Sequence, residues 1–94
     1  MTLALTREEF DIVREIVREF GPAWLFGSRV WGAPGPFADL DVALVNQPHQ
    51  RGGLEILRER FDESRLSFVV DVSVLGQLPL AWQEKILTSG LRIE

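Results

Sequence analysis

Residues 27–44 read GSRVWGAPGPFADLDVAL, and two aspartates in this stretch decide how the chain is interpreted. Asp39 and Asp41 lie two positions apart in an apolar run that we expect to form a strand over residues 39–45. Residues two apart on a strand point to the same face, with their Cα atoms about 6.6 Å apart. The sequence therefore predicts two carboxylates on one strand face, shortly after a loop that begins with Gly27 and Ser28.

The composition is that of one small globular domain, which we expect to span residues 1–94. Hydrophobic residues make up 46% of the chain and charged residues 26%, which is ordinary for a folded protein. No cysteine is present, so disulfides and thiolate zinc sites are excluded. No apolar run approaches the roughly 20 residues of a membrane span, and the N-terminus lacks the pattern of a secretory signal. We expect a cytoplasmic protein.

The charge distribution weighs against nucleic acid as a direct partner. The formal net charge is −4, whereas proteins that bind phosphate backbones present basic stripes. The ten basic residues are instead interspersed with acids along the chain, as on a solvated helix face with ion pairs.

The remaining pattern predicts short helices and strands in alternation. Thr6 to Glu9 is a capping box that starts a helix ended by Gly21 and Pro22. Further along, we expect strands over 23–26 and 67–74, helices over 54–64 and from Pro79 to Gly90, and a terminal edge strand over 91–94. The expected fold class is α/β (α+β), a small mixed sheet with helices on one face.

A third carboxylate, Asp71, lies on the more polar face of the 67–74 strand. If this strand neighbours the 39–45 strand, three carboxylates converge. Two such charges 6–7 Å apart repel by about 2–3 kcal/mol at an effective dielectric constant near 20. Arginine pairing or hard divalent cations could compensate, and two cations bridged by carboxylates are the apparatus of in-line nucleotidyl transfer.

The Gly27-Ser28 pair supplies a possible phosphate site. Glycine lets the backbone approach a phosphate closely, and serine offers N–H and hydroxyl donors. Each motif alone has a simpler explanation: exposed strands often carry acids, and Gly-Ser is often only a turn. Gly27 and Gly32 have the spacing of a P-loop, but Ala33 and Pro34 stand where that motif needs Lys-Ser/Thr. The order of the motifs together favours nucleotide chemistry.

These residues resemble a known family. Gly-Ser, a second glycine five residues later and an Asp-x-Asp after a short loop are similar to the signature of minimal nucleotidyltransferases in the DNA polymerase beta superfamily, and Asp71 in FVVDVSV fits that superfamily's third carboxylate. The resemblance covers nearly the whole chain and implies a nucleotidyltransferase fold. Ala38 and the bulky Val30-Trp31 pair depart from the usual pattern.

Carried over by position, the resemblance implies that Gly27 and Ser28 bind the triphosphate of ATP. Arg29 is interpreted either as a further phosphate contact or as an ordinary exposed surface arginine. It implies that Asp39, Asp41 and Asp71 are the catalytic residues and hold two Mg²⁺ ions, and that Asp71 assists deprotonation of the acceptor hydroxyl. It also implies an antitoxin that adds AMP to a helical HEPN-type ribonuclease toxin, usually at a tyrosine. The chain contains no tyrosine, so such an acceptor must lie on the partner.

Two other functions stay open from the sequence. The first is a catalytically silent antitoxin that neutralises its partner by occlusion, and the second is a nucleotidyltransferase subunit that acts on a small-molecule hydroxyl. Two tryptophans, Trp31 and Trp82, are interpreted as packed side chains or as a protein contact.

Overall fold

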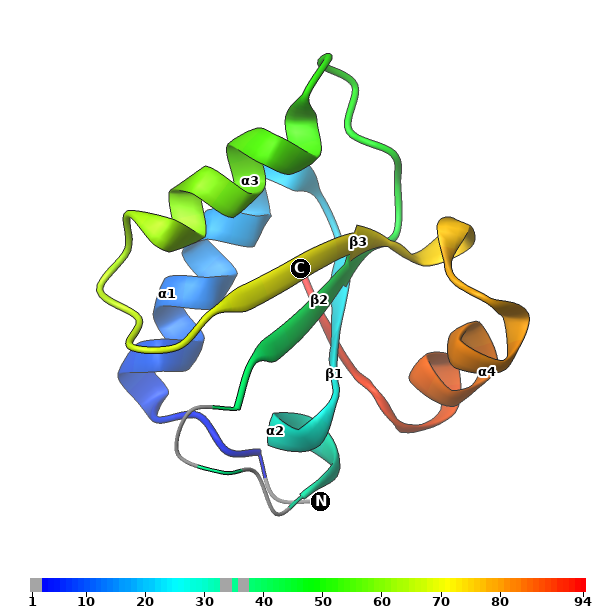
Figure 1. Ribbon diagram of the computed structural model, residues 1–94, viewed down its shortest axis with the longest axis horizontal. Helices are drawn as coiled ribbons and strands as arrows, with labels where there is room; N and C mark the ends of the chain where they lie inside the picture. The colour runs from blue at the N-terminus through cyan, green and yellow to red at the C-terminus, as the bar shows by residue number, and fades with distance from the viewer. Residues whose placement is uncertain (1–2, 33–34, 36–37) are drawn as a thin grey trace.

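The computed structural model, in which residues 3–32, 35 and 38–94 are described, contains a four-stranded mixed sheet (Figure 1). The sheet order is β3-β2-β1-β4, with β2 and β3 parallel and the other neighbours antiparallel. The elements are α1 (Arg7–Val17), η1 (Arg18–Phe20), β1 (Ala23–Phe26), α2 (Ser28–Trp31), β2 (Leu40–Leu44), α3 (Gly53–Asp62), β3 (Val70–Val74), η2 (Leu75–Gln77), α4 (Leu80–Ser89) and β4 (Leu91–Ile93). The α+β class expected from the sequence is confirmed, and this fold is consistent with a nucleotidyltransferase.

Helices α1 and α3 pack on one face of the sheet, where they build the main core. The predicted capping box starts α1: Glu9 N–H donates to the Thr6 hydroxyl, and Thr6 N–H donates to the Glu9 carboxylate. Alternate strand residues face these helices and are fully buried, because their period of two places them on one side. This core joins Val13 and Val17 of α1, Leu57 and Phe61 of α3, and Leu25, Leu40, Val42, Leu44, Val70 and Val72 of the strands.

Helix α4 packs on the opposite face of the sheet, which corrects the expectation that all helices share one face. Its buried residue, Ile86, contacts Phe26 of β1 and Ala43 of β2. These strand residues alternate with the ones that face α1 and α3, so they point to the other side. In Figure 1, α1 and α3 lie to one side of the strands and α4 to the other. None of the described helices is long and apolar enough to cross a bilayer.

Strands β2 and β3 are neighbours, as the convergence of three carboxylates requires. The register pairs Asp41 with Asp71 and Val42 with Val72. The strand predicted from Asp39 instead begins at Leu40, so Asp39 lies just before it, and β3 begins at Val70 rather than at residue 67. Parallel pairing fixes Asp41 and Asp71 side by side at the strand spacing of about 4.8 Å.

Candidate active site

The carboxylates of Asp41 and Asp71 lie on the sheet face opposite the main core. Their strand neighbours Leu40, Val42 and Val72 point into that core, so the aspartates point to the α4 side. Asp41 is half-buried, whereas Asp39 and Asp71 are exposed. The sequence prediction that the acidic side chains come from two neighbouring strands is thus confirmed for Asp41 and Asp71, with Asp39 at the entry to β2.

Electrostatics show that the three carboxylates interact. Burial, then the negative charges of Asp71 and Asp39, raises the pKa of the Asp41 carboxyl from 3.8 to about 6. Among the described residues, none of the ion pairs includes any of these three aspartates. The arginine compensation considered from the sequence is therefore not seen among these residues, and the Asp41 carboxyl adds a further negative charge as the pH rises through about 6.

Gly27 lies directly against the Asp41 carboxylate. A Cβ atom built on Gly27 would be 2.1 Å from Asp41 Oδ2, far inside van der Waals contact. The residue has φ 91° and ψ −168°, a backbone region that is essentially restricted to glycine. Ser28 follows and is exposed at the start of α2. Glycine is therefore required at position 27 for two reasons: its backbone conformation, and the lack of space for a Cβ atom beside Asp41. The Gly27-Ser28 turn consequently lies next to the Asp41 carboxylate.

Arg29 occupies a different place from the one expected of a phosphate ligand. Its side chain is buried, with a residue exposure of only 8%. Nε donates to the carbonyl of Ala38 at 2.7 Å, and a terminal guanidinium nitrogen donates to the carbonyl of Ala4 at 2.9 Å. The guanidinium also lies 3.9 Å from the ring centroid of Phe68. Arg29 thus joins the segment before Asp39 to the N-terminal segment and to the approach to β3, which corrects its interpretation as an open phosphate contact.

The donor set fits a hard divalent cation without forming a finished cage. Within the described part of the chain, no group of three or more His, Cys, Asp or Glu side chains is already arranged as a metal site. The pKa of Asp41 is nevertheless raised, first by burial and then by the charges of Asp71 and Asp39, so negative charge gathers around the Asp41 carboxyl. Carboxylate oxygens are the ligands that Mg²⁺ prefers, and a cation between them would relieve this repulsion.

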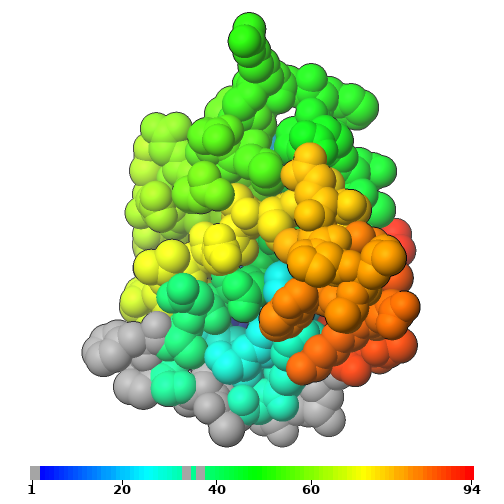
Figure 2. Space-filling model, turned by 45° about the vertical axis from the view of Figure 1, so that its right-hand side comes forward, coloured from blue at the N-terminus to red at the C-terminus, as the bar shows by residue number. Residues whose placement is uncertain are grey.

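A cavity of about 310 Å³ opens beside Asp41 and Asp71. Its other walls come from β1, from the end of η2 and from α4. Figure 2 shows this side of the molecule, with yellow atoms of the β3 region and orange atoms of α4 on either side of the green and cyan surface between them. The described lining residues are Phe26, Asp41, Asp71, Val72, Ser73, Leu78, Pro79 and Trp82.

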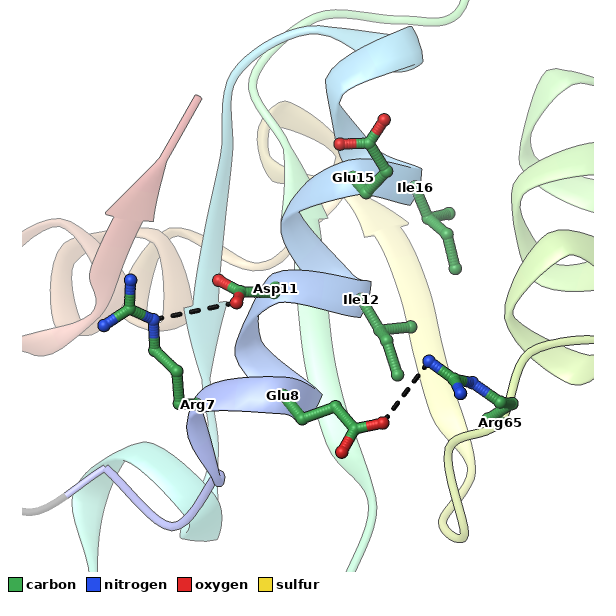
Figure 3. Close-up of a pocket in the computed structure, with 7 residues that line it drawn as sticks. All are labelled: Arg7, Glu8, Asp11, Ile12, Glu15, Ile16 and Arg65. Carbon is green, nitrogen blue, oxygen red and sulfur yellow. Dashed lines mark ion pairs between the residues drawn. The ribbon is translucent and has the colours of Figure 1, made fainter.

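A larger hollow, about 680 Å³, lies along the outer side of α1, on the opposite face of the sheet from the aspartates (Figure 3). Its charged side chains are already paired: Arg7 contacts Asp11 at 3.6 Å, and Arg65 contacts Glu8 at 3.3 Å. Ile12 and Ile16 point to the same side of α1 as the Glu8–Arg65 pair and supply the apolar part of the lining. Size alone favours this hollow, but its paired charges offer no reactive group, so we place the candidate active site in the smaller cavity with the carboxylates.

The structure is a mixed sheet with aspartates on two neighbouring strands and an adjoining Gly-Ser turn. This arrangement is consistent with a nucleotidyltransferase. No protein-family model matches the chain. The chain is similar to the probable protein adenylyltransferase MntA of Haemophilus influenzae, with 36% identity over 74 residues. The alignment covers 74% of this chain and 65% of the relative, so slightly less than two thirds of that protein's length is represented. The similarity supports the interpretation as a minimal nucleotidyltransferase.

Sequence reasoning missed the α4 wall of the cavity and the short helix α2. Trp82 lines the cavity beside two of the aspartates, although the sequence offered only packing or a protein contact for it. The signal available was its position on a helix near Ile86, but nothing local indicates which sheet face that helix covers. Trp31 is half-buried and donates from Nε1 to the carbonyl of Ser89 at 3.0 Å, which agrees with the packed interpretation.

Proposed function

We propose that this protein transfers AMP from ATP to a hydroxyl group of a partner protein. The observation that carries the proposal is the pairing of Asp41 with Asp71 on neighbouring strands beside the Gly27 turn. Burial there, and then the charges of Asp71 and Asp39, raise the pKa of Asp41 to about 6. The similarity to a probable protein adenylyltransferase supports the reaction and the type of acceptor.

Asp39, Asp41 and Asp71 would hold two Mg²⁺ ions. When bound, such ions supply positive charge that activates an attacking hydroxyl and stabilises departing pyrophosphate. The Gly27-Ser28 turn would bind the triphosphate. Ser28 is exposed, and Gly27 has no side chain that would keep a phosphate away from the backbone N–H groups. Arg29 acts as a positioning residue, because it fixes the carbonyl of Ala38, the residue before Asp39.

In the proposed reaction the acceptor hydroxyl oxygen forms a bond to the α-phosphorus. The bond from that phosphorus to the bridging oxygen of the β-phosphate breaks, and pyrophosphate leaves with that oxygen. The hydroxyl proton passes to the Asp71 carboxylate, which is exposed at the mouth of the cavity and accessible to an acceptor. Asp71 then releases the proton to solvent.

The proposed acceptor is a tyrosine of a HEPN-type toxin, and the protein would act as its antitoxin. This part of the proposal comes from the family resemblance and from the absence of tyrosine in this chain. The Asp71 carboxylate is exposed where the cavity of about 310 Å³ opens, so the hydroxyl of a separate protein can approach it.

The test is transfer of label from ATP labelled at the α-phosphate to the product of the neighbouring gene, with Mg²⁺ present. We expect the partner to gain the α-phosphate label and the mass of one adenylyl group. Label at the γ-phosphate should leave with pyrophosphate and not appear on the partner, and chelation with EDTA should abolish transfer. Asp39→Asn should abolish transfer. Absence of transfer by wild-type protein that binds Mg²⁺ and ATP would refute the enzymatic proposal.

The same variant separates enzyme from occluding antitoxin. An occluding protein would still neutralise the partner when Asp39 is Asn, whereas an enzyme would lose both transfer and neutralisation. If wild-type protein labels a small-molecule hydroxyl and not the partner, the acceptor part of the proposal is wrong and the nucleotidyl transfer part stands.

A further inference from the structure

Trp82 is unusually accessible for the largest type of side chain, since 46% of the residue is exposed. It belongs to an aromatic cluster in which its ring centroid lies 6.2 Å from that of Phe26 and 6.0 Å from that of Trp31. The cluster lies on the sheet face that carries the carboxylates, and Trp82 lines the same cavity as Asp41 and Asp71. A large aromatic surface is thus held beside the candidate active site and only partly covered by protein.

The rest of the cluster holds the Trp82 ring in place. Trp31 and Trp82 stack with an interplanar angle of 19°. The Lys85 ammonium lies 4.2 Å from the Trp31 ring centroid and 6.0 Å from that of Trp82, so a cation–π contact covers part of Trp31. Trp31 is further fixed by its hydrogen bond to Ser89. The indole of Trp82 is therefore a rigid surface, oriented before any ligand arrives.

The chain connectivity relates this surface to the proposed phosphate turn. Phe26, which contacts Trp82, directly precedes Gly27. The proposed phosphate turn therefore begins one residue after a side chain that packs against Trp82. Besides the acidic residues, the cavity is lined by the apolar side chains of Trp82, Leu78 and Pro79. These walls suit a flat, uncharged ring rather than a further phosphate.

We propose that Trp82 is the stacking platform for the base of the bound nucleotide. This inference rests on the proposed nucleotidyl transfer. Every base presents a π face, and loss of one aromatic platform in nucleic-acid complexes weakens binding by about 1–3 kcal/mol per base, which is about 5- to 150-fold in affinity.

The experiment compares a ligand that has a base with one that lacks it. Titration calorimetry measures the binding of ATP and of inorganic triphosphate, each with Mg²⁺, to wild type, Trp82→Ala, Trp82→Phe and Leu87→Ala. Leu87 is a matched control because it is an exposed apolar residue of the same helix, 53% exposed, and does not line the cavity. Thermal unfolding of each variant checks that α4 stays folded, and Trp82→Phe keeps a ring if the alanine variant unfolds.

We expect Trp82→Ala to weaken ATP binding about 5- to 150-fold and to leave triphosphate binding unchanged. We expect Trp82→Phe to bind ATP nearly as well as wild type does. The inference is overturned if Trp82→Ala binds ATP like wild type, if it loses ATP and triphosphate equally, or if only the affinity for the protein partner falls. Wild type that binds triphosphate as tightly as ATP also overturns it, but leaves the proposed function standing. Wild type that binds neither ligand refutes the proposed function itself.

Discussion

Replacing Asp41 by asparagine should stabilise the protein near neutral pH while removing its function. The Asp41 carboxyl has a pKa raised from 3.8 to about 6, first by burial and then by Asp71 and Asp39. A shift of about 2 pKa units corresponds to about 3 kcal/mol at 1.36 kcal/mol per unit. Because the side chain is only half-buried, solvent screening reduces this, and we expect about 1–2 kcal/mol. Asparagine has nearly the same shape and carries no charge.

The sign of the pH dependence follows from linkage. The folded state binds the Asp41 proton more tightly than the unfolded state, so its contribution to stability is fully present below about pH 4 and is lost as pH rises through about 6. Urea unfolding in EDTA should therefore show Asp41→Asn equal to wild type at pH 4 and more stable by about 1–2 kcal/mol at pH 7.5. Asp62→Asn, on exposed α3 surface, controls for the loss of one charge. A variant that is no more stable than wild type at pH 7.5, or equally more stable at both pH values, would refute the reasoning.

Two further substitutions test how the site is built. Gly27→Ala should cost more stability than Gly21→Ala: both positions have nearly the same backbone angles, and strain of about 1–3 kcal/mol is expected at each, but only at Gly27 does the new Cβ strike the Asp41 carboxylate. Equal losses in urea unfolding would show that the close approach is unimportant. Arg29→Met should cost about 2–4 kcal/mol because two carbonyls lose their buried donor, whereas Arg58→Met, at an exposed position on α3, should change stability by less than about 0.5 kcal/mol. A small effect of Arg29→Met would refute its positioning role.

Most of the acidic face could be predicted because strand geometry is local. The period of two places Asp41 opposite Val42 and Leu40, and the same rule places Asp71 opposite Val70 and Val72. The sequence predicts Asp39 on the same strand, because no residue near it indicates that the strand begins at Leu40. Helix α2 has only four residues, too few for a periodic pattern to reveal it.

The features that the sequence did not reveal depend on contacts between distant segments. Arg29 contacts Ala4, Ala38 and Phe68. The residues next to Arg29 in the sequence do not indicate that these three segments pack around its side chain. The side of the sheet that α4 covers depends on Ile86 fitting against Phe26 and Ala43. Both features shape the site, since one fixes the approach to Asp39 and the other brings Trp82 to the cavity.

The most direct test of the central claim is anomalous diffraction from crystals grown with Mn²⁺ and a non-hydrolysable ATP analogue. Manganese substitutes for magnesium with oxygen ligands, and its anomalous signal locates each ion. We predict manganese peaks within coordination distance of the Asp39, Asp41 and Asp71 carboxylates, with the triphosphate at Gly27-Ser28. Crystals that contain the bound nucleotide but show no peak at these three aspartates would contradict it.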